Sequence, residues 1–278
     1  MIMQSMLTCR QLPFSHPAYK LVKSMLMANL KNLAAAAVYA TLSGISLVHA
    51  DTATLGEPSA IAGEAWAYKF TPSYFVTTNT TDAVDLNLRA NDGPHAVWLG
   101  QYQRDGEFEQ TRIGYEYRAQ ISYVQIVPSL QLATHGFAGG SINAQIGDAI
   151  FALLGFGRTN LHEYYNLNFD PNDSVTYGLG TSLLAKSTLS IFAVKDDRLG
   201  TDQIVIHAVW RMLTGDHLRW TLDLSSKQGR ATVGDEVVYG NAVSLTCDFR
   251  NIFVRLAQDA KVNFTAENQT RFTLGVRF

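Results

Sequence analysis

Five histidines lie beyond position 50, and they are the residues best suited to acid–base chemistry: His95, His135, His162, His207 and His217. A histidine on a strand reaches a nucleophilic serine two residues away, because side chains two positions apart share a face. Two positions beyond these histidines stand Val97, Phe137, Tyr164, Val209 and Arg219. None of them is a serine and no G-x-S-x-G motif occurs, so a serine hydrolase is not expected.

Carboxylates and one cysteine are the remaining candidates for chemistry. Asp196-Asp197 and Asp216-His217 could serve an aspartate-type protease, but they fall in turn segments where such residues need no catalytic role. The run 170–173 could offer oxygen ligands to calcium, yet it lacks the glycine and distal glutamate of an EF-hand loop. Cys247 lies on an apolar strand face, where a thiol is inert. We therefore expect no enzyme activity, no metal site and no cofactor.

The elements that position these residues show an alternation of apolar and polar residues with a period of two. The pattern recurs in segments of about ten residues separated by turn-forming residues. Thirteen segments fit it: 64–77, 82–91, 95–104, 110–118, 121–134, 141–157, 174–184, 187–195, 203–213, 217–227, 237–249, 252–261 and 270–278. Single-chain bacterial barrels have even strand numbers, so one segment is expected to be wrong, at 110–134 or 141–157. The second contains an apolar run, Ile150–Phe156, that could form a short helix.

These strands predict an all-β fold, an antiparallel transmembrane β-barrel of about 12 strands within a range of about 10 to 14. A soluble β-sandwich also alternates in this way. The barrel is favoured because strands of this length match a tilted bilayer crossing, and because aromatic residues fall near strand ends as in interfacial girdles. Those aromatic residues are Tyr68, Trp98, Tyr102, Tyr117, Tyr123, Trp210, Trp220, Tyr239 and Phe278.

The first fifty residues predict an export signal. Lys31 precedes the apolar run 33–48, and Val48-His49-Ala50 fits a small-residue cleavage site. We expect residues 1–50 to be a presequence and signal peptide cleaved after Ala50, followed by a single barrel domain over 51–278; a membrane anchor is the alternative. Beyond position 50 the chain carries 18 basic and 24 acidic residues, a net charge of −6 that gives no case for nucleic acid.

The final strand resembles the terminal signature of bacterial outer-membrane β-barrel proteins. Its alternating apolar residues Phe272, Leu274 and Val276 end in a C-terminal Phe278. The resemblance implies a place in the bacterial outer membrane, contact with outer-membrane lipid, and recognition of this strand by the outer-membrane assembly machinery. A second segment, 155–173, is similar to one in uncharacterised proteins of the same class and implies no activity.

If the apolar faces meet lipid, the opposite faces line the barrel interior. We expect the charged and titratable lining residues to be Arg89, Arg112, Glu116, Arg118, His207, Arg211, Arg219, Asp223, Lys227, Asp248, Arg250, Arg255, Arg271 and Arg277, with Asp85 and Asp259. Cations outnumber carboxylates in this set, so most other carboxylates are expected at the rims. Arg211 and Arg219 are expected to point inward from two neighbouring strands joined by the turn 214–216.

Two kinds of function follow from such an interior. Rings of Arg and Lys favour anions, so the first prediction is a passive, porin-like channel for small, preferentially anionic solutes. Alternatively, the charges pair and fill the interior, which predicts a non-conducting structural or surface-interaction barrel; an outer-membrane lipid hydrolase is a further alternative. Because about eight strands leave only side-chain space and about sixteen leave a water channel, twelve strands do not decide between them.

Overall fold

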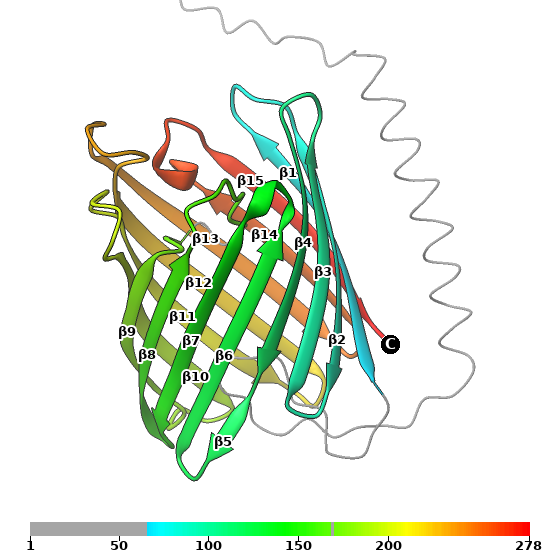
Figure 1. Ribbon diagram of the computed structural model, residues 1–278. Helices are drawn as coiled ribbons and strands as arrows, with labels where there is room; N and C mark the ends of the chain where they lie inside the picture. Colours follow the sequence, from blue (N-terminus) through cyan, green and yellow to red (C-terminus); the bar gives the residue numbers. More distant parts are fainter. Residues whose placement is uncertain (1–65, 168–169) are drawn as a thin grey trace, which may run out of the picture. The chain divides into compact units, whose positions relative to one another are not determined.

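A computed structural model describes residues 66–167 and 170–278, which form a closed antiparallel β-barrel (Figure 1). Consecutive wall strands pair in chain order, and the ring closes where the first strand pairs with the last. The predicted signal peptide and its cleavage site, together with residues 168–169, lie outside the described residues. Among the described residues, no helix is long and apolar enough to cross a membrane.

Fourteen strands form the wall, and one short strand lies beside it. The strands are β1 (Ala67–Thr77), β2 (Ala83–Asp92), β3 (His95–Arg104), β4 (Phe108–Tyr117), β5 (Ala119–Ile121), β6 (Val124–Ala133), β7 (Ala138–Gly147), β8 (Ile150–Thr159), β9 (Ser174–Thr181), β10 (Ser187–Asp196), β11 (Ile204–Thr214), β12 (Leu218–Gly229), β13 (Val238–Phe249), β14 (Ile252–Asp259) and β15 (Gln269–Arg277). Strand β5 is the additional one, because it pairs with β6 just beyond the end of the β4–β6 pairing.

The predicted count of about 12 strands is wrong. The error lies at 141–157, which is neither one strand nor a strand and a helix but the hairpin β7–β8. Gly147 adopts a φ of 120° at this turn, a value that side chains disfavour, so the chain reverses there. The apolar run after it alternates as a strand does, with Phe151 and Leu153 buried and Ile150 and Leu154 exposed.

Alternation divides each strand into an apolar outer face and a mixed inner face. On β14, Val254 and Leu256 are about half exposed while Phe253 and Asp259 are buried. The same division gives an outer belt of exposed apolar side chains that includes Leu86, Leu88, Leu99, Ile113, Leu130, Leu132, Ile191, Ile206, Leu245, Val254, Leu256 and Phe272.

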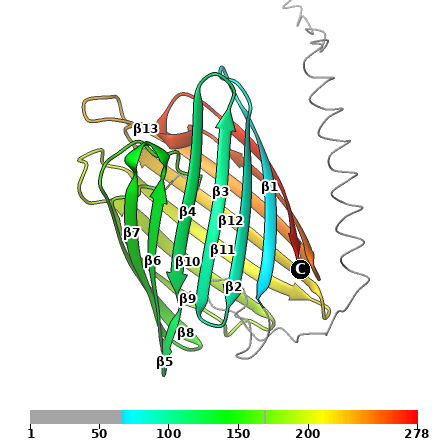
Figure 2. The same cartoon turned by 45° about the vertical axis from the view of Figure 1, so that its right-hand side comes forward.

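The two ends of the barrel differ in the length of their connections (Figure 2). The end that holds the start of β1 and the end of β15, here called the terminus end, has short turns. The opposite end, here called the loop end, carries longer connections, of which 160–173 is the longest. Two 3-10 helices, η1 (Thr134–Gly136) and η2 (Val262–Phe264), also belong to loop-end connections.

Aromatic residues occupy both faces of the wall. Tyr68 and Phe278 stack at the terminus end with ring centroids 5.8 Å apart, and their backbones exchange hydrogen bonds of 2.8 and 2.9 Å. Two residues expected in the outer girdle lie inside instead. Trp98 packs its indole over Gly114, where a side chain would collide, and Tyr102 is fully buried.

Candidate functional site: a lumen crossed by one loop

The connection 160–173 is here called the crossing loop, and its described parts, 160–167 and 170–173, make contacts across the barrel interior. It joins β8 to β9, and in a ring of fourteen strands these lie seven steps from β15 and β1, on the opposite wall. The Leu167 carbonyl accepts a 3.1 Å hydrogen bond from Arg271 Nη1 on β15. Gln269, also on β15, donates a 3.1 Å hydrogen bond to the Tyr165 hydroxyl. The loop therefore reaches from one wall of the lumen to the other.

Tyr165 anchors the outward leg of the crossing loop. Its ring stacks on Tyr102 of β3, with centroids 4.0 Å apart and planes 17° from parallel. Its backbone N–H donates to Gln110 Oε1 on β4 at 3.3 Å, and Arg104 Nη2 donates to its hydroxyl at 3.3 Å. An aromatic ring held by stacking and three polar contacts fixes this leg against the β3–β4 side of the lumen.

A histidine bridge holds the return leg. Asp170 Oδ1 lies 3.0 Å from His207 Nε2 on β11, and His207 Nδ1 lies 3.0 Å from Asp223 Oδ1 on β12. Phe192 of β10 stacks on the imidazole, with centroids 4.8 Å apart. Both ring nitrogens are thus used, and the loop is tied to a second part of the wall.

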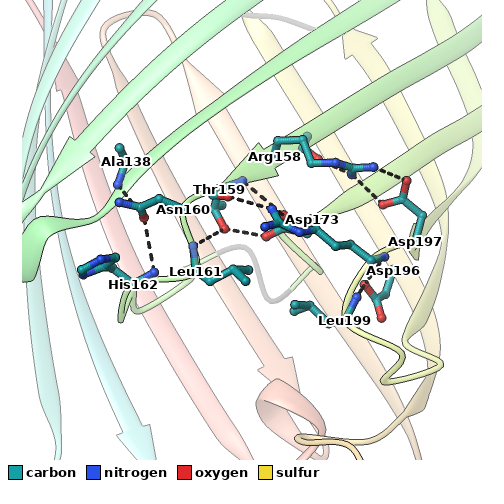
Figure 3. A network of polar contacts seen from close by, with 12 residues as sticks. Ala138, Arg158, Thr159, Asn160, Leu161, His162, Asp173, Asp196, Asp197 and Leu199 are labelled. Atoms are coloured by element: carbon teal, nitrogen blue, oxygen red, sulfur yellow. Dashed lines mark hydrogen bonds and ion pairs between the residues drawn. The ribbon is translucent and has the colours of Figure 1, made fainter.

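The two ends of the crossing loop are clamped together at the rim (Figure 3). Asp173 accepts hydrogen bonds from the Thr159 backbone at 3.2 Å, the Thr159 hydroxyl at 2.5 Å and Arg198 Nη1 at 2.8 Å. Asn160 Oδ1 accepts from the Ala138 N–H at 3.0 Å. Because the buried Asp173 at one end of the crossing loop bonds Thr159 at the other end, the base of the loop is held in place.

An ion pair beside this clamp ties β8 to the next loop-end turn. Arg158 donates two hydrogen bonds to Asp197, of 2.7 and 2.6 Å (Figure 3). These bonds lower the pKa of the Asp197 carboxyl below its ordinary value. Bidentate geometry of this kind also fixes the orientation of both groups.

The wall from β1 to β4 carries charges that are paired and buried. Arg112 bonds Asp85, and the two side chains are 2% and 5% exposed. Nearer the terminus end, Arg89 bonds Glu116. Phe75 is fully buried on the same inner face, next to Tyr102. This wall is filled, and both of its inner-face carboxylates are bonded to arginines.

The wall from β11 to β14 is different. Lys227 bonds Asp259, and Arg277 of β15 bonds Asp248 of β13 at 3.0 and 2.6 Å. Within residues 66–167 and 170–278, however, Arg211 and Arg219 make neither a hydrogen bond nor an ion pair through their side chains. These two arginines are half-buried and leave a local excess of positive charge on this wall.

Most predicted lining residues lie on inner-face positions of the strands, and two lie elsewhere. Arg250 is not a lining residue: it is exposed in the turn between β13 and β14, with its guanidinium 5.3 Å from the Phe249 ring centroid. The turn takes up residues 250–251, so alternation ends one position earlier than expected. Arg118 lies between β4 and β5, half-buried, with its N–H bonded to the Pro94 carbonyl at 2.8 Å.

The carboxylates gather at one rim rather than at both. In the described connections of the loop end, eleven acidic residues accompany three basic ones. In the connections of the terminus end, two acidic residues accompany three basic ones. The barrel is therefore acidic at the loop end and slightly basic at the other.

Sequence reasoning missed the residues that narrow the lumen. The sequence patterns predict Tyr102 in a girdle and Asp170 in a turn, and they indicate no role for Gln110 and Tyr165. The available signal was the long connection 160–173 itself, because an unusually long loop without secondary structure is commonly functional. No group of three or more potential metal ligands is present in the part of the chain described.

Comparisons with known proteins find only distant likenesses. The sequence matches no protein-family model and no curated protein. It is similar in structure to the outer membrane protein Omp33 of Acinetobacter baumannii, at 9% identity and a TM-score of 0.47, over 77% of this chain and 98% of that one. The KdgM porin gives 9% identity and 0.42 over 76% and 98%. OprD of Pseudomonas aeruginosa gives 10% identity and 0.41 over 77% and 94%.

Proposed function

We propose that this protein is a passive channel of the bacterial outer membrane that conducts small, preferentially anionic solutes through an interior narrowed by the crossing loop. One observation carries the proposal. The loop ties together a filled wall whose carboxylates are bonded to arginines and a wall that bears two arginines without carboxylate partners among the described residues.

The outer surface supports a membrane location. A monomeric soluble protein rarely exposes a large continuous apolar patch, whereas this barrel exposes leucine, isoleucine and valine side chains on strand after strand. Its fourteen wall strands are 8 to 12 residues long, close to the 9–11 residues that a tilted bilayer crossing needs. Short turns at the terminus end and long connections at the other match the arrangement of outer-membrane barrels, whose long loops face outward.

The closing strand supports the proposed route of assembly. Phe272 is about half exposed on the outer face of β15, and Phe278 stacks on Tyr68 where the ring closes. An apolar strand edge ending in an aromatic residue is available to the outer-membrane assembly machinery before β1 and β15 join. We include recognition through this strand in the proposal.

The size of the barrel supports conduction past the loop. Fourteen strands lie between a barrel of about eight, which side chains fill, and one of about sixteen, which encloses water. A loop with a fixed base and two wall tethers narrows such an interior without filling it along its whole length. The constriction is then set by Tyr165 and Asp170 rather than by the strands.

The charge distribution supports anion preference. Arginine keeps its charge at any physiological pH, so Arg211 and Arg219 act as permanent positive charges beside the constriction. Cationic residues lining a pore lower the energy of a passing anion. The acidic residues of the loop end lie in the wider mouth, where mobile ions screen charges over about 8 Å at physiological ionic strength.

Planar-bilayer recording of the purified full-length protein tests the conducting function. We expect steady unitary current steps from folded barrels. A folded barrel that inserts yet carries no current in any salt would contradict the proposal and favour the second candidate, a non-conducting structural barrel. The crossing loop is the observation that favours this candidate, because a loop tied to the opposite wall would also close the lumen.

A further inference from the structure

Several inner-face cations of this barrel bond carboxylates, whereas two make no side-chain bond to any described residue. Arg89, Arg112, Lys227 and Arg277 each bond one carboxylate. Among the described residues, the Arg211 and Arg219 side chains bond none. Since charged side chains are rarely buried without partners, this pair is the exception on the inner face.

The carboxylates nearest to the two arginines are already engaged. Asp223 places its two oxygens 3.0 and 3.3 Å from His207 Nδ1. Asp248, which stands directly opposite Arg219 in the β12–β13 register, accepts from Arg277 with both oxygens. Asp223 is near enough to attract Arg211 electrostatically, but within the described residues no carboxylate oxygen bonds Arg211 or Arg219.

The two arginines are placed to act on one ligand. Arg211 faces Thr221 across the β11–β12 pairing, and Arg219 lies two residues before Thr221 on the same face. Side chains in this diagonal relation have Cα atoms about 7–8 Å apart, within reach of two long arginines. They are close enough to repel each other electrostatically. Thr221 adds a hydroxyl donor between them.

We propose that Arg211, Arg219 and Thr221 form a binding site for an oxyanion group, carboxylate or phosphate, of the permeating solute. The guanidinium fork matches two oxygens of such a group, which a simple halide cannot offer. This site rests on the proposed channel function. It adds to that function a saturable binding site, whereas a general positive field would not saturate. Binding of an oxyanion also replaces the repulsion between the two arginines with two charge-assisted contacts.

Equilibrium binding to the detergent-folded, full-length barrel tests this site without any need for conduction. The probes are inorganic phosphate, acetate and chloride at matched ionic strength, followed by calorimetry and by the thermal midpoint. We expect phosphate, acetate or both to saturate and to raise the midpoint as a ligand of the folded state does, while chloride does not. If only phosphate saturates the barrel, the oxyanion group of the solute is a phosphate. If only acetate does, the group is a carboxylate.

Substitutions distinguish a binding site for an oxyanion from a general positive field in the lumen. Arg211→Gln/Arg219→Gln should weaken oxyanion binding at least about tenfold, whereas the neutral double variant Arg89→Gln/Glu116→Gln should retain it. Arg211→Lys/Arg219→Lys keeps both charges but loses both forks, so it should keep anion selectivity and lose most of the binding. Equal response to chloride and phosphate, or full binding by the glutamine variant, would overturn the site. A barrel that binds phosphate but never conducts would overturn the channel function alone.

Discussion

The two walls that face each other across the lumen use charge in opposite ways. On β2 and β4, Arg112 and Asp85 bond each other with almost no exposure, so their charges contribute to packing. On β11 and β12, Arg211 and Arg219 are half-buried and have no carboxylate partner among the described residues. The difference shows that inward-facing arginines cannot be counted as one class. An arginine paired by its neighbour is structural, and an arginine left unpaired is available to a solute.

The largest effect should come from breaking a pair on the filled wall. Arg112→Gln leaves Asp85 buried without its cation, a loss typically of about 3–5 kcal/mol. Arg211→Gln should cost little, because it removes the burial cost of a charge that makes no ion pair, and the attraction to Asp223 is lost together with the repulsion from Arg219. Denaturant unfolding of the two variants in detergent measures both values.

The double variant Arg112→Met/Asp85→Leu is the control for that experiment. Replacing both partners with apolar residues removes the uncompensated charge, so most of the stability should return. Equal losses for Arg112→Gln and Arg211→Gln would show that the two walls do not differ in this way.

The next effect should come from removing the link between the walls. Replacing residues 161–171 with a short Gly-Ser linker deletes Tyr165 and Asp170, the contacts that carry the loop across the lumen. Unitary conductance should rise several-fold, because fourteen strands enclose more space than the loop leaves open. Anion preference should fall at the same time, since wider pores screen their wall charges better. Unchanged conductance in a folded variant would place the constriction elsewhere.

A smaller effect should follow from the unequal rims. Acidic residues dominate the loop end, while the unpaired arginines lie toward the terminus end of their strands. Currents at equal and opposite voltages should therefore differ in size. The asymmetry should be clear at 0.1 M salt, where the Debye length is about 10 Å, and should vanish near 1 M, where it is about 3 Å. A symmetric current–voltage curve at low salt contradicts this expectation.

The smallest effect concerns acid. The Arg158 hydrogen bonds lower the pKa of Asp197 in the folded protein. Its contribution to rim stability is therefore full above the ordinary aspartate pKa of about 3.9 and is lost as pH falls through the lower folded value. The protection factors of crossing-loop amides, which correct for the pH dependence of intrinsic exchange, should stay constant from pH 7 to 5 and fall below about pH 4. Arg158→Gln should remove most of that acid dependence; an unaltered profile would contradict a stabilising role of the Arg158–Asp197 ion pair.

Much of this fold could be predicted from local patterns, because the residues of a barrel strand alternate between the outer face and the inner face. The alternation in β12 and β15 is visible without any knowledge of their neighbours. The predicted strand count differs at β7 and β8, because the turn signal Gly147-Asp148 is short and stands inside an otherwise continuous apolar pattern. Arg250 was misplaced for a related reason, since alternation does not show where a strand stops.

The site could be predicted only in part. Positions on one face follow from period two, but pairing depends on register between strands that are distant in sequence. Arg112 finds Asp85 across an intervening strand, β3, and nothing local distinguishes it from Arg211. The path of the crossing loop likewise depends on Tyr102 and Gln269, which lie far away along the chain.

The reversal potential of single channels across a salt gradient tests the central claim most directly. Wild-type protein should give an anion-directed potential, Arg211→Glu/Arg219→Glu should move it toward cation selectivity, and Arg250→Glu, which changes an exposed turn residue, should leave it near the wild-type value. A wild-type channel that prefers cations, or a folded and conducting double variant with an unchanged potential, would contradict the account.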